Sequence, residues 1–115
     1  MSERREYPRI HRKRKVGFLL SDGSIEYLWT VNISRGGMQL HTEHLVDLGD
    51  QFNIRFGVFD SKTEEYALIA ARIEVVHKVY DGSLGEFRIG VRFVSFDGDG
   101  EDIYTRHLKD LEMHI

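Results

Sequence analysis

From Val16 onward, apolar residues recur at every second position, and this period constrains the fold more than any other feature of the chain. A period of two is typical of strands with one buried face, because successive side chains of a strand point to opposite sides. The segments that share this alternation number six: 16–20, 25–31, 38–42, 52–58, 66–80 and 87–93.

Turn residues separate these segments. "SDGS" at 21–24 and "DGS" at 81–83 each carry an Asp-Gly pair, which is a signal for a tight turn between antiparallel strands. Six short antiparallel strands would leave exposed edges in an open sheet, whereas a barrel pairs every edge. We therefore expect an all-β fold, a closed or nearly closed six-stranded antiparallel β-barrel.

The period changes near the C-terminus. The apolar residues of the last segment share a helical spacing: Tyr104, Leu108, Leu111 and Ile115. Asp99 stands where a helix-capping residue is favoured. We expect a short C-terminal α-helix that leans on the barrel or closes one end of it.

The charge of the chain is unevenly distributed. Residues 1–15 hold seven of the sixteen lysines and arginines against two acids, a formal charge of +5. Residues 16–115 carry −8, so the whole chain carries −3. Like charges repel, and the first segment has almost nothing apolar to bury, so we expect a flexible basic arm at 1–15 and a barrel domain at 16–115. The cluster 12–15 is expected to be solvated.

Composition also bears on location. The chain has no cysteine, which excludes disulfides and favours a reducing cytoplasm. No apolar run approaches the roughly 18 residues of a membrane helix, and no apolar segment of a signal peptide follows the basic start. We expect a cytoplasmic protein that is not inserted into a membrane.

Motifs for catalysis are missing. The sequence contains neither Gly-x-Ser-x-Gly nor a phosphate-binding P-loop. His41 and His44 resemble a metal pair, but residues three apart on a strand point to opposite faces, and no further ligand follows at a recognisable spacing. We expect no enzymatic activity, no metal and no cofactor.

The segment "VNISRGGMQL" at 31–40 presents polar side chains at a strand end. Asn32 and Ser34 are two residues apart and so share a face, while Gly36 and Gly37 let the chain turn sharply. These polar groups either stabilise the turn by bonding nearby backbone or bind a ligand.

The arm contains Arg4, Arg5 and Arg9, and Pro8 disfavours a helix at the residue before it. A guanidinium can donate two parallel bonds to a phosphate, contact O6 and N7 of guanine, or stack on a purine. A solvated tail is the alternative interpretation of such a basic run.

Together the two motifs resemble the PilZ domain, a bacterial receptor for cyclic di-GMP. The family signature is Arg-x-x-x-Arg, followed some twenty to thirty residues later by Asp/Asn-x-Ser-x-x-Gly. The chain has Arg5-Glu6-Tyr7-Pro8-Arg9 and Asn32-Ile33-Ser34-Arg35-Gly36-Gly37. "GGMQL", "ARIEVVH" and "RIGVRF" add to the resemblance, which covers the chain from residue 4 to the final helix.

The resemblance implies a ligand site between the barrel surface and the arm. Arg5 and Arg9 would hold phosphates and guanine edges, Asn32 and Ser34 would hydrogen-bond a guanine, and Gly37 would let backbone approach the ligand. Asparagine at the aspartate position removes a charged acceptor, so affinity is expected to be lower.

Two further residues extend this site. Arg4 adds a third guanidinium, which leads to the hypothesis that two cyclic di-GMP molecules bind as a stacked pair. His77 falls where many family members carry an aromatic side chain beside the ligand, and it is a secondary candidate; a surface histidine without a role is the alternative.

The function implied is a receptor switch in which the ligand fastens the arm to the barrel and a downstream protein partner, in control of motility, biofilm or exopolysaccharide, reads the result. One alternative is a PilZ-like adaptor that binds no nucleotide. Another is a binder of single-stranded nucleic acid. The acidic body and the presence of Tyr7 as the one aromatic residue near the arm argue against this last alternative, so no DNA or RNA is expected.

Overall fold

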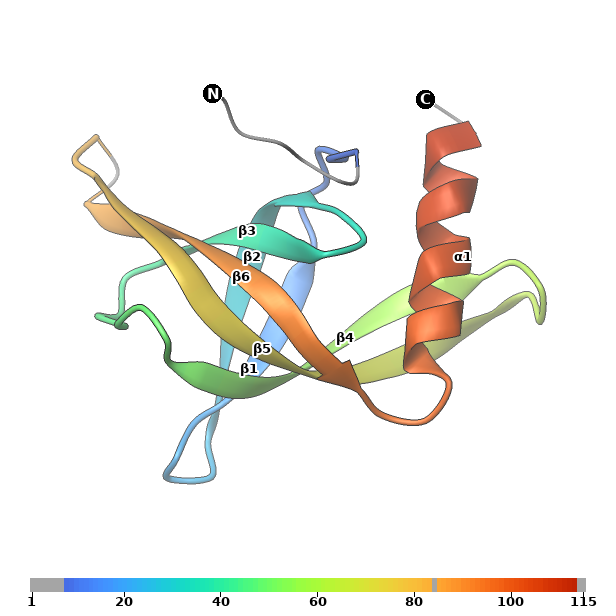
Figure 1. Ribbon diagram of the computed structural model, residues 1–115, viewed down its shortest axis with the longest axis horizontal. Helices are drawn as coiled ribbons and strands as arrows, with labels where there is room; N and C mark the ends of the chain where they lie inside the picture. The colour runs from blue at the N-terminus through green and yellow to red at the C-terminus, as the bar shows by residue number, and fades with distance from the viewer. Residues whose placement is uncertain (1–7, 84, 114–115) are drawn as a thin grey trace.

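The computed structural model describes residues 8–83 and 85–113, which form six strands and one helix (Figure 1). The elements are β1 (Lys15–Leu19), β2 (Ile25–Ile33), β3 (Gly37–Thr42), β4 (Gln51–Asp60), β5 (Glu65–Asp81), β6 (Glu86–Phe96) and α1 (Gly100–Met113). All neighbouring strands are antiparallel, and their order β1-β2-β3-β6-β5-β4 closes into a barrel. The predicted barrel with a C-terminal helix is confirmed.

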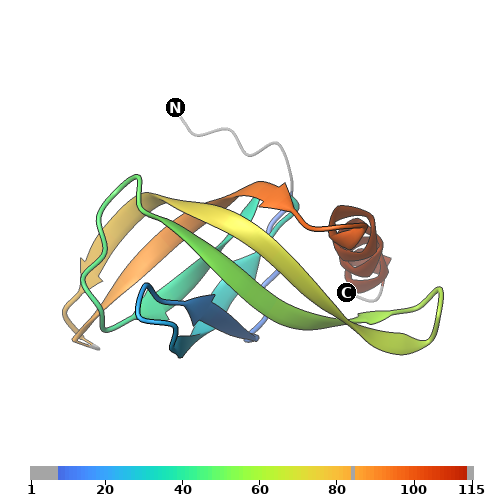
Figure 2. The same cartoon turned by 90° about the horizontal axis from the view of Figure 1, so that it is seen from below.

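The barrel closes where β1 meets β4. Gly17 pairs with Arg55, and Phe18 pairs with Ile54. The β4–β5 hairpin is longer than this seam and extends past the barrel beside α1 (Figure 2). Register shifts in the β2–β3 and β5–β6 pairs mark β-bulges, which bend strands and so help a small sheet to close.

The alternation on β4, β5 and β6 predicts the core correctly. The side chains that point inward from these strands are buried: Ile54, Phe56, Val58, Ile69, Ala71, Ile73, Val75, Ile89 and Val91. They form one hydrophobic cluster with Val16 and Phe18 of β1. Burial of this cluster is the main favourable term for folding.

On β2 the alternating apolar residues face outward. Ile25, Tyr27 and Trp29 are 46%, 58% and 45% exposed, whereas Leu28 is buried. The register explains the inversion: Val16 pairs with Leu28, and paired residues of adjacent strands point to the same side. A period of two identifies the residues that share a face, but it does not say which face is inside.

Helix α1 covers one mouth of the barrel. Tyr104 is almost fully buried, and its ring packs edge-on against Phe56 and Phe93, with centroids 5.5 and 5.2 Å away. Its hydroxyl donates to the Ser34 carbonyl oxygen at 2.8 Å, and burial raises the pKa of this phenol. The expected apolar stripe is confirmed at Tyr104 and Leu108, while Ile115 lies outside the described residues.

A two-point ion pair fastens α1 to the protruding hairpin. Arg106 donates from Nη2 and Nε to the two carboxylate oxygens of Asp60, at 2.9 and 3.3 Å. The hydrogen bond from Arg106 lowers the pKa of Asp60.

Among the described residues, no helix has the length and apolar character needed to cross a bilayer.

Gly37 lies against the backbone of β6. A Cβ at this position would be 2.0 Å from the Val91 carbonyl oxygen, so any side chain would push β3 away from β6. We expect Gly37→Ala to lower the free energy of unfolding by about 3 kcal/mol, at the upper end of overpacking costs, as measured by urea denaturation.

Gly57→Ala is the matched control, because the nearest atom to its added Cβ is the Ala67 carbonyl oxygen at 4.0 Å. Its stability should stay within about 0.5 kcal/mol of the parent. Equal effects of the two substitutions would contradict the packing argument.

Candidate functional site

The segment before β1 lies along β2. Ile10 exchanges two backbone hydrogen bonds with Ile33, at 2.8 and 2.9 Å, and its side chain is buried in the core cluster. Further along, the Thr30 hydroxyl donates to the Arg12 carbonyl and accepts from the Arg14 amide. The expectation that this segment buries almost nothing apolar is therefore wrong at Ile10, because the barrel offers that side chain an apolar site.

Arg9 joins the two motifs. Its Nη1 donates to Oδ1 of Asn32 at 2.8 Å, across 23 positions of sequence. The Asn32 amide in turn donates from Nδ2 to Oε1 of Gln39 at 2.8 Å. This second bond fixes the orientation of the Asn32 amide, so that its oxygen faces the arginine. Nε of Arg9 is buried and has no hydrogen-bond partner among the described residues.

A row of outward positions crosses four strands at this level. Asn32 on β2 pairs with Gln39 on β3, Gln39 with Gly90 on β6, and Gly90 with His77 on β5. Gly90 has no side chain, so it leaves a gap in the row of side chains between Gln39 and His77. A Cβ at Gly90 would lie 3.2 Å from that of His77. The register thus brings His77, which is exposed, into line with Asn32.

Ser34 and Gly37 form the turn between β2 and β3. The Ser34 amide donates to the Gly37 carbonyl at 2.8 Å, and its hydroxyl donates to the same oxygen at 3.3 Å. The turn-stabilising interpretation therefore describes Ser34 in this structure. Close packing on Val91 by itself accounts for glycine at position 37.

The remaining arginines of the arm, Arg4 and Arg5, lie outside the described residues.

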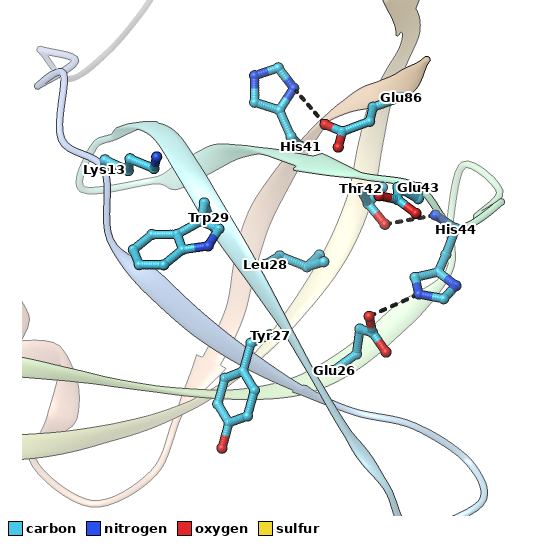
Figure 3. Close-up of a pocket in the computed structure, with 10 residues that line it drawn as sticks. All are labelled: Lys13, Glu26, Tyr27, Leu28, Trp29, His41, Thr42, Glu43, His44 and Glu86. Atoms are coloured by element: carbon cyan, nitrogen blue, oxygen red, sulfur yellow. Dashed lines mark hydrogen bonds and ion pairs between the residues drawn. The ribbon is translucent and has the colours of Figure 1, made fainter. Parts of the chain in front are cut away.

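The two histidines that resembled a metal pair each lie beside a carboxylate (Figure 3): His44 is 3.0 Å from Glu26, and His41 is 3.8 Å from Glu86. Within 8–83 and 85–113, no group of three potential ligands is placed to hold a metal ion.

Arg14 connects the start of β1 to the helix. Its Nη2 lies 2.9 Å from Nε2 of His107, and its Nη1 donates to the Gly57 carbonyl at 3.2 Å. Nδ1 of His107 lies 3.1 Å from the Phe59 carbonyl. These partners assign the proton to Nδ1, because Arg14 can only donate and a carbonyl can only accept. The expected solvated cluster at 12–15 is therefore wrong for Arg14, which is half-buried.

Three residues of this region were missed by sequence reasoning. Gln39 and Gly90 occupy outward positions, and only the strand register, which no local pattern encodes, places them beside Asn32 and His77. Arg14 was hidden within a run of similar charges. Nothing in its sequence neighbourhood distinguishes it from Arg12, whose side chain is exposed.

The chain is similar to one known family and to several solved structures. A family model described as "PilZ domain" matches residues 3–110. The inhibitor of motility MotI/DgrA of Bacillus subtilis has a TM-score of 0.76 at 15% identity, over 98% of this chain and 52% of its own. No curated protein matches the sequence.

Two solved complexes are also similar. The MrkH–c-di-GMP complex of K. pneumonia has a TM-score of 0.71 at 16% identity, over 98% of this chain and 53% of its own. YcgR of Escherichia coli, in complex with c-di-GMP, has a TM-score of 0.71 at 20% identity, over 97% and 47%. Identities this low show the fold alone, and the chain spans about half the length of each of these proteins.

The Arg14–His107 contact predicts a pH dependence of stability. Burial and the adjacent Arg14 guanidinium lower the pKa of His107, so the unfolded chain takes up this proton before the folded one does. The contribution of His107 is therefore complete above the unfolded pKa of about 6.5 and is lost as the pH falls below it.

We expect the difference in unfolding free energy between the parent and His107→Gln to shrink as the pH is lowered from 7.5 to 5, in urea titrations at each pH. His11→Gln, which removes an exposed imidazole, serves as the control. A parent-to-variant difference that does not change with pH would refute the assignment.

Proposed function

The chain belongs to the PilZ domain family, and from this membership we propose that it is a cytoplasmic bacterial receptor for cyclic di-GMP rather than an enzyme. The nucleotide would bind on the outer surface of the barrel, along the row from Asn32 to His77 and beneath the arginines that precede β1. A downstream protein would respond to the complex.

The bond between Arg9 and Asn32 is the observation that carries this proposal. It joins the Arg-x-x-x-Arg segment to the Asn-x-Ser-x-x-Gly segment directly, with 2.8 Å between donor and acceptor. In the sequence these two side chains are 23 positions apart. Their contact in the fold supports a single site built from both segments.

Arg9 has the chemistry for the phosphate end of this ligand. Nη1 is engaged with Asn32, while Nε is a buried donor without a partner among the described residues. An anionic oxygen beside Nε would satisfy that donor with a charge-assisted bond. We propose Arg4 and Arg5 for phosphate or guanine contacts on the family motif alone.

Asn32 and Ser34 would recognise a guanine. A hydroxyl donates one hydrogen bond and accepts two, so Ser34 can keep its bond to the Gly37 carbonyl and still accept one from a guanine N–H. Asn32 is uncharged, and its oxygen already accepts from Arg9. We therefore expect weaker affinity than an aspartate would provide at this position.

The gap at Gly90 would accommodate a base or the ribose-phosphate ring of the ligand. Gly90 leaves space between Gln39 and His77, and His77 can stack or donate from its imidazole. Gly37 would contribute backbone at the edge of this surface. Gln39 would act indirectly by holding the Asn32 amide.

Ligand-induced ordering of the arm is part of the proposal, with a limit set by the structure. Ile10 is already paired with Ile33, so the segment that the ligand would fasten lies before Ile10. The phosphates would offset the repulsion among the arginines there. The solved complexes of MrkH and YcgR contain c-di-GMP. MotI/DgrA is named as an inhibitor of motility, and we likewise propose control of motility as an output of this chain.

Removal of the Arg9 guanidinium should weaken cyclic di-GMP binding by about tenfold to hundredfold, because a charge-assisted contact and the link to Asn32 are lost together. Isothermal titration calorimetry on the parent and Arg9→Ala measures this. Arg12→Ala is the matched control, since it removes an exposed arginine from the same segment. Absence of binding by the parent would refute the function, and equal affinity of both variants would refute the site.

Stoichiometry tests the stacked pair of ligands. We expect two molecules of cyclic di-GMP per chain for the parent, and one for Arg4→Ala if Arg4 stacks on the second molecule. The same calorimetry gives both values. One ligand per chain in the parent, unchanged by the substitution, would eliminate the hypothesis.

A further inference from the structure

A second surface of the barrel carries exposed aromatic and basic side chains. It lies on the outward positions of β1, β2 and β4 and of residues 66–72 of β5. We call it the basic aromatic face; its centre is formed by Lys15, Tyr27, Trp29, Arg55 and Leu68, with Lys13 at its border. The exposed large apolar side chains at these outward positions are Ile25, Tyr27, Trp29, Phe59, Tyr66 and Leu68.

None of these outward positions carries a carboxylate, although the chain has nineteen acids and a net charge of −3. The backbone of Arg55 is paired in the sheet, whereas its exposed side chain makes no hydrogen bond or ion pair with the side chain of any described residue. Around this face, carboxylates of the described residues lie only at its border. Glu26 and Glu86 are each next to a histidine (Figure 3), and Glu74, which pairs with Gln51 at the edge, is engaged by Arg92. Glu43 and Asp22 also lie at this border. The centre of the face is therefore basic although the chain as a whole is acidic.

Two lysines lie over the aromatic rings. Nζ of Lys13 is 5.2 Å from the Trp29 ring centroid, and Nζ of Lys15 is 5.0 Å from that of Tyr27. Figure 3 shows Tyr27 and Trp29 projecting side by side from β2, with Lys13 close to the indole. The ammonium groups are attracted to the ring faces, and the rings hold the charges at defined places.

Two glycines lie near the centre of this face. The side chains of Ile25 and Tyr27 cover Gly17, with atoms 3.2 and 3.3 Å from the position of an added Cβ. Above Gly57 the nearest atom is 4.0 Å from that position, so a partner side chain has room there. Both β1 and β4 are paired on each side in the closed barrel, so a partner cannot add a strand here. Recognition has to come from side chains.

We propose that the basic aromatic face docks an acidic segment of a partner protein, one in which carboxylates flank an apolar side chain. The carboxylates would pair with Lys13, Lys15 and Arg55, and the apolar side chain would lie over Gly57, between Trp29 and Leu68. Tyr, Trp and Arg are the side chains that contribute most at protein interfaces. Charge complementarity would select the partner and speed its association. The proposal does not depend on nucleotide binding.

Two other polyanions are less well matched. The expectation that Tyr7 is the one aromatic residue near the arm that could stack on a base is wrong, because Trp29 and Tyr27 lie beside Lys13 and Lys15. A lysine ammonium nevertheless lies over one face of each ring, so that face is not open for a stacked base as in a single-strand binder. An anionic membrane is an extended surface that would also meet the acidic surroundings of this face, whereas a short acidic segment contacts the basic aromatic face alone.

Trp29 is the only tryptophan of the chain, so its fluorescence reports on this face directly. The test adds a short synthetic peptide that alternates glutamate with leucine and phenylalanine to the full-length protein. We expect a saturable shift of the Trp29 emission. The Lys15→Glu/Arg55→Glu variant should bind the peptide at least about tenfold more weakly, and Lys109→Glu on α1 is the matched control.

Three comparison probes decide between occupants: the same peptide with lysine for glutamate, oligothymidylate, and vesicles of phosphatidylcholine and phosphatidylserine. Tighter binding of any of them than of the acidic peptide overturns the proposal, as does the absence of a response to that peptide. Self-association seen by analytical ultracentrifugation and abolished by Lys15→Glu/Arg55→Glu would assign the face to a second copy of the chain instead. Circular dichroism confirms that each variant is folded.

Discussion

Pairing of β1 with β4 closes the barrel. It satisfies the backbone groups that two free edges would otherwise expose, and it turns a sheet into a barrel with an inside and an outside. Once the barrel is closed, Val16 and Phe18 must point inward, and Leu28 follows them through its register with β1. Tyr27 and Trp29 are left outside for the same reason.

Closure also determines how the segment before β1 is held. β2 continues past the start of β1, so residues 10–14 lie along it and Ile10 enters the core. Arg14 then reaches Gly57 and His107 on the far side of the seam. The same short segment carries Arg9 toward Asn32 and Lys13 toward Trp29. The proposed nucleotide site and the basic aromatic face therefore share one structural support.

The β2–β3 turn is held from three sides. Gly37 packs on the Val91 carbonyl, Ser34 bonds to Gly37 within the turn, and Tyr104 donates to the Ser34 carbonyl from the helix. Residues that a binding motif would assign to ligand thus also have structural partners. A turn with these contacts presents Asn32 in one orientation, and pre-organisation of this kind lowers the cost of binding.

Local patterns were enough to predict the six strands, the helix and the two motifs, because each depends on local period or on residues close together in the chain. Local patterns did not predict that the apolar side of β2 faces outward, that Ile10 is buried or that Arg14 is separated from its basic neighbours. Nor did they place Gln39, Gly90 and His77 in one row with Asn32. These features depend on register, because a shift of one residue between two strands exchanges inside for outside, and register is set by bulges and by closure of the whole barrel.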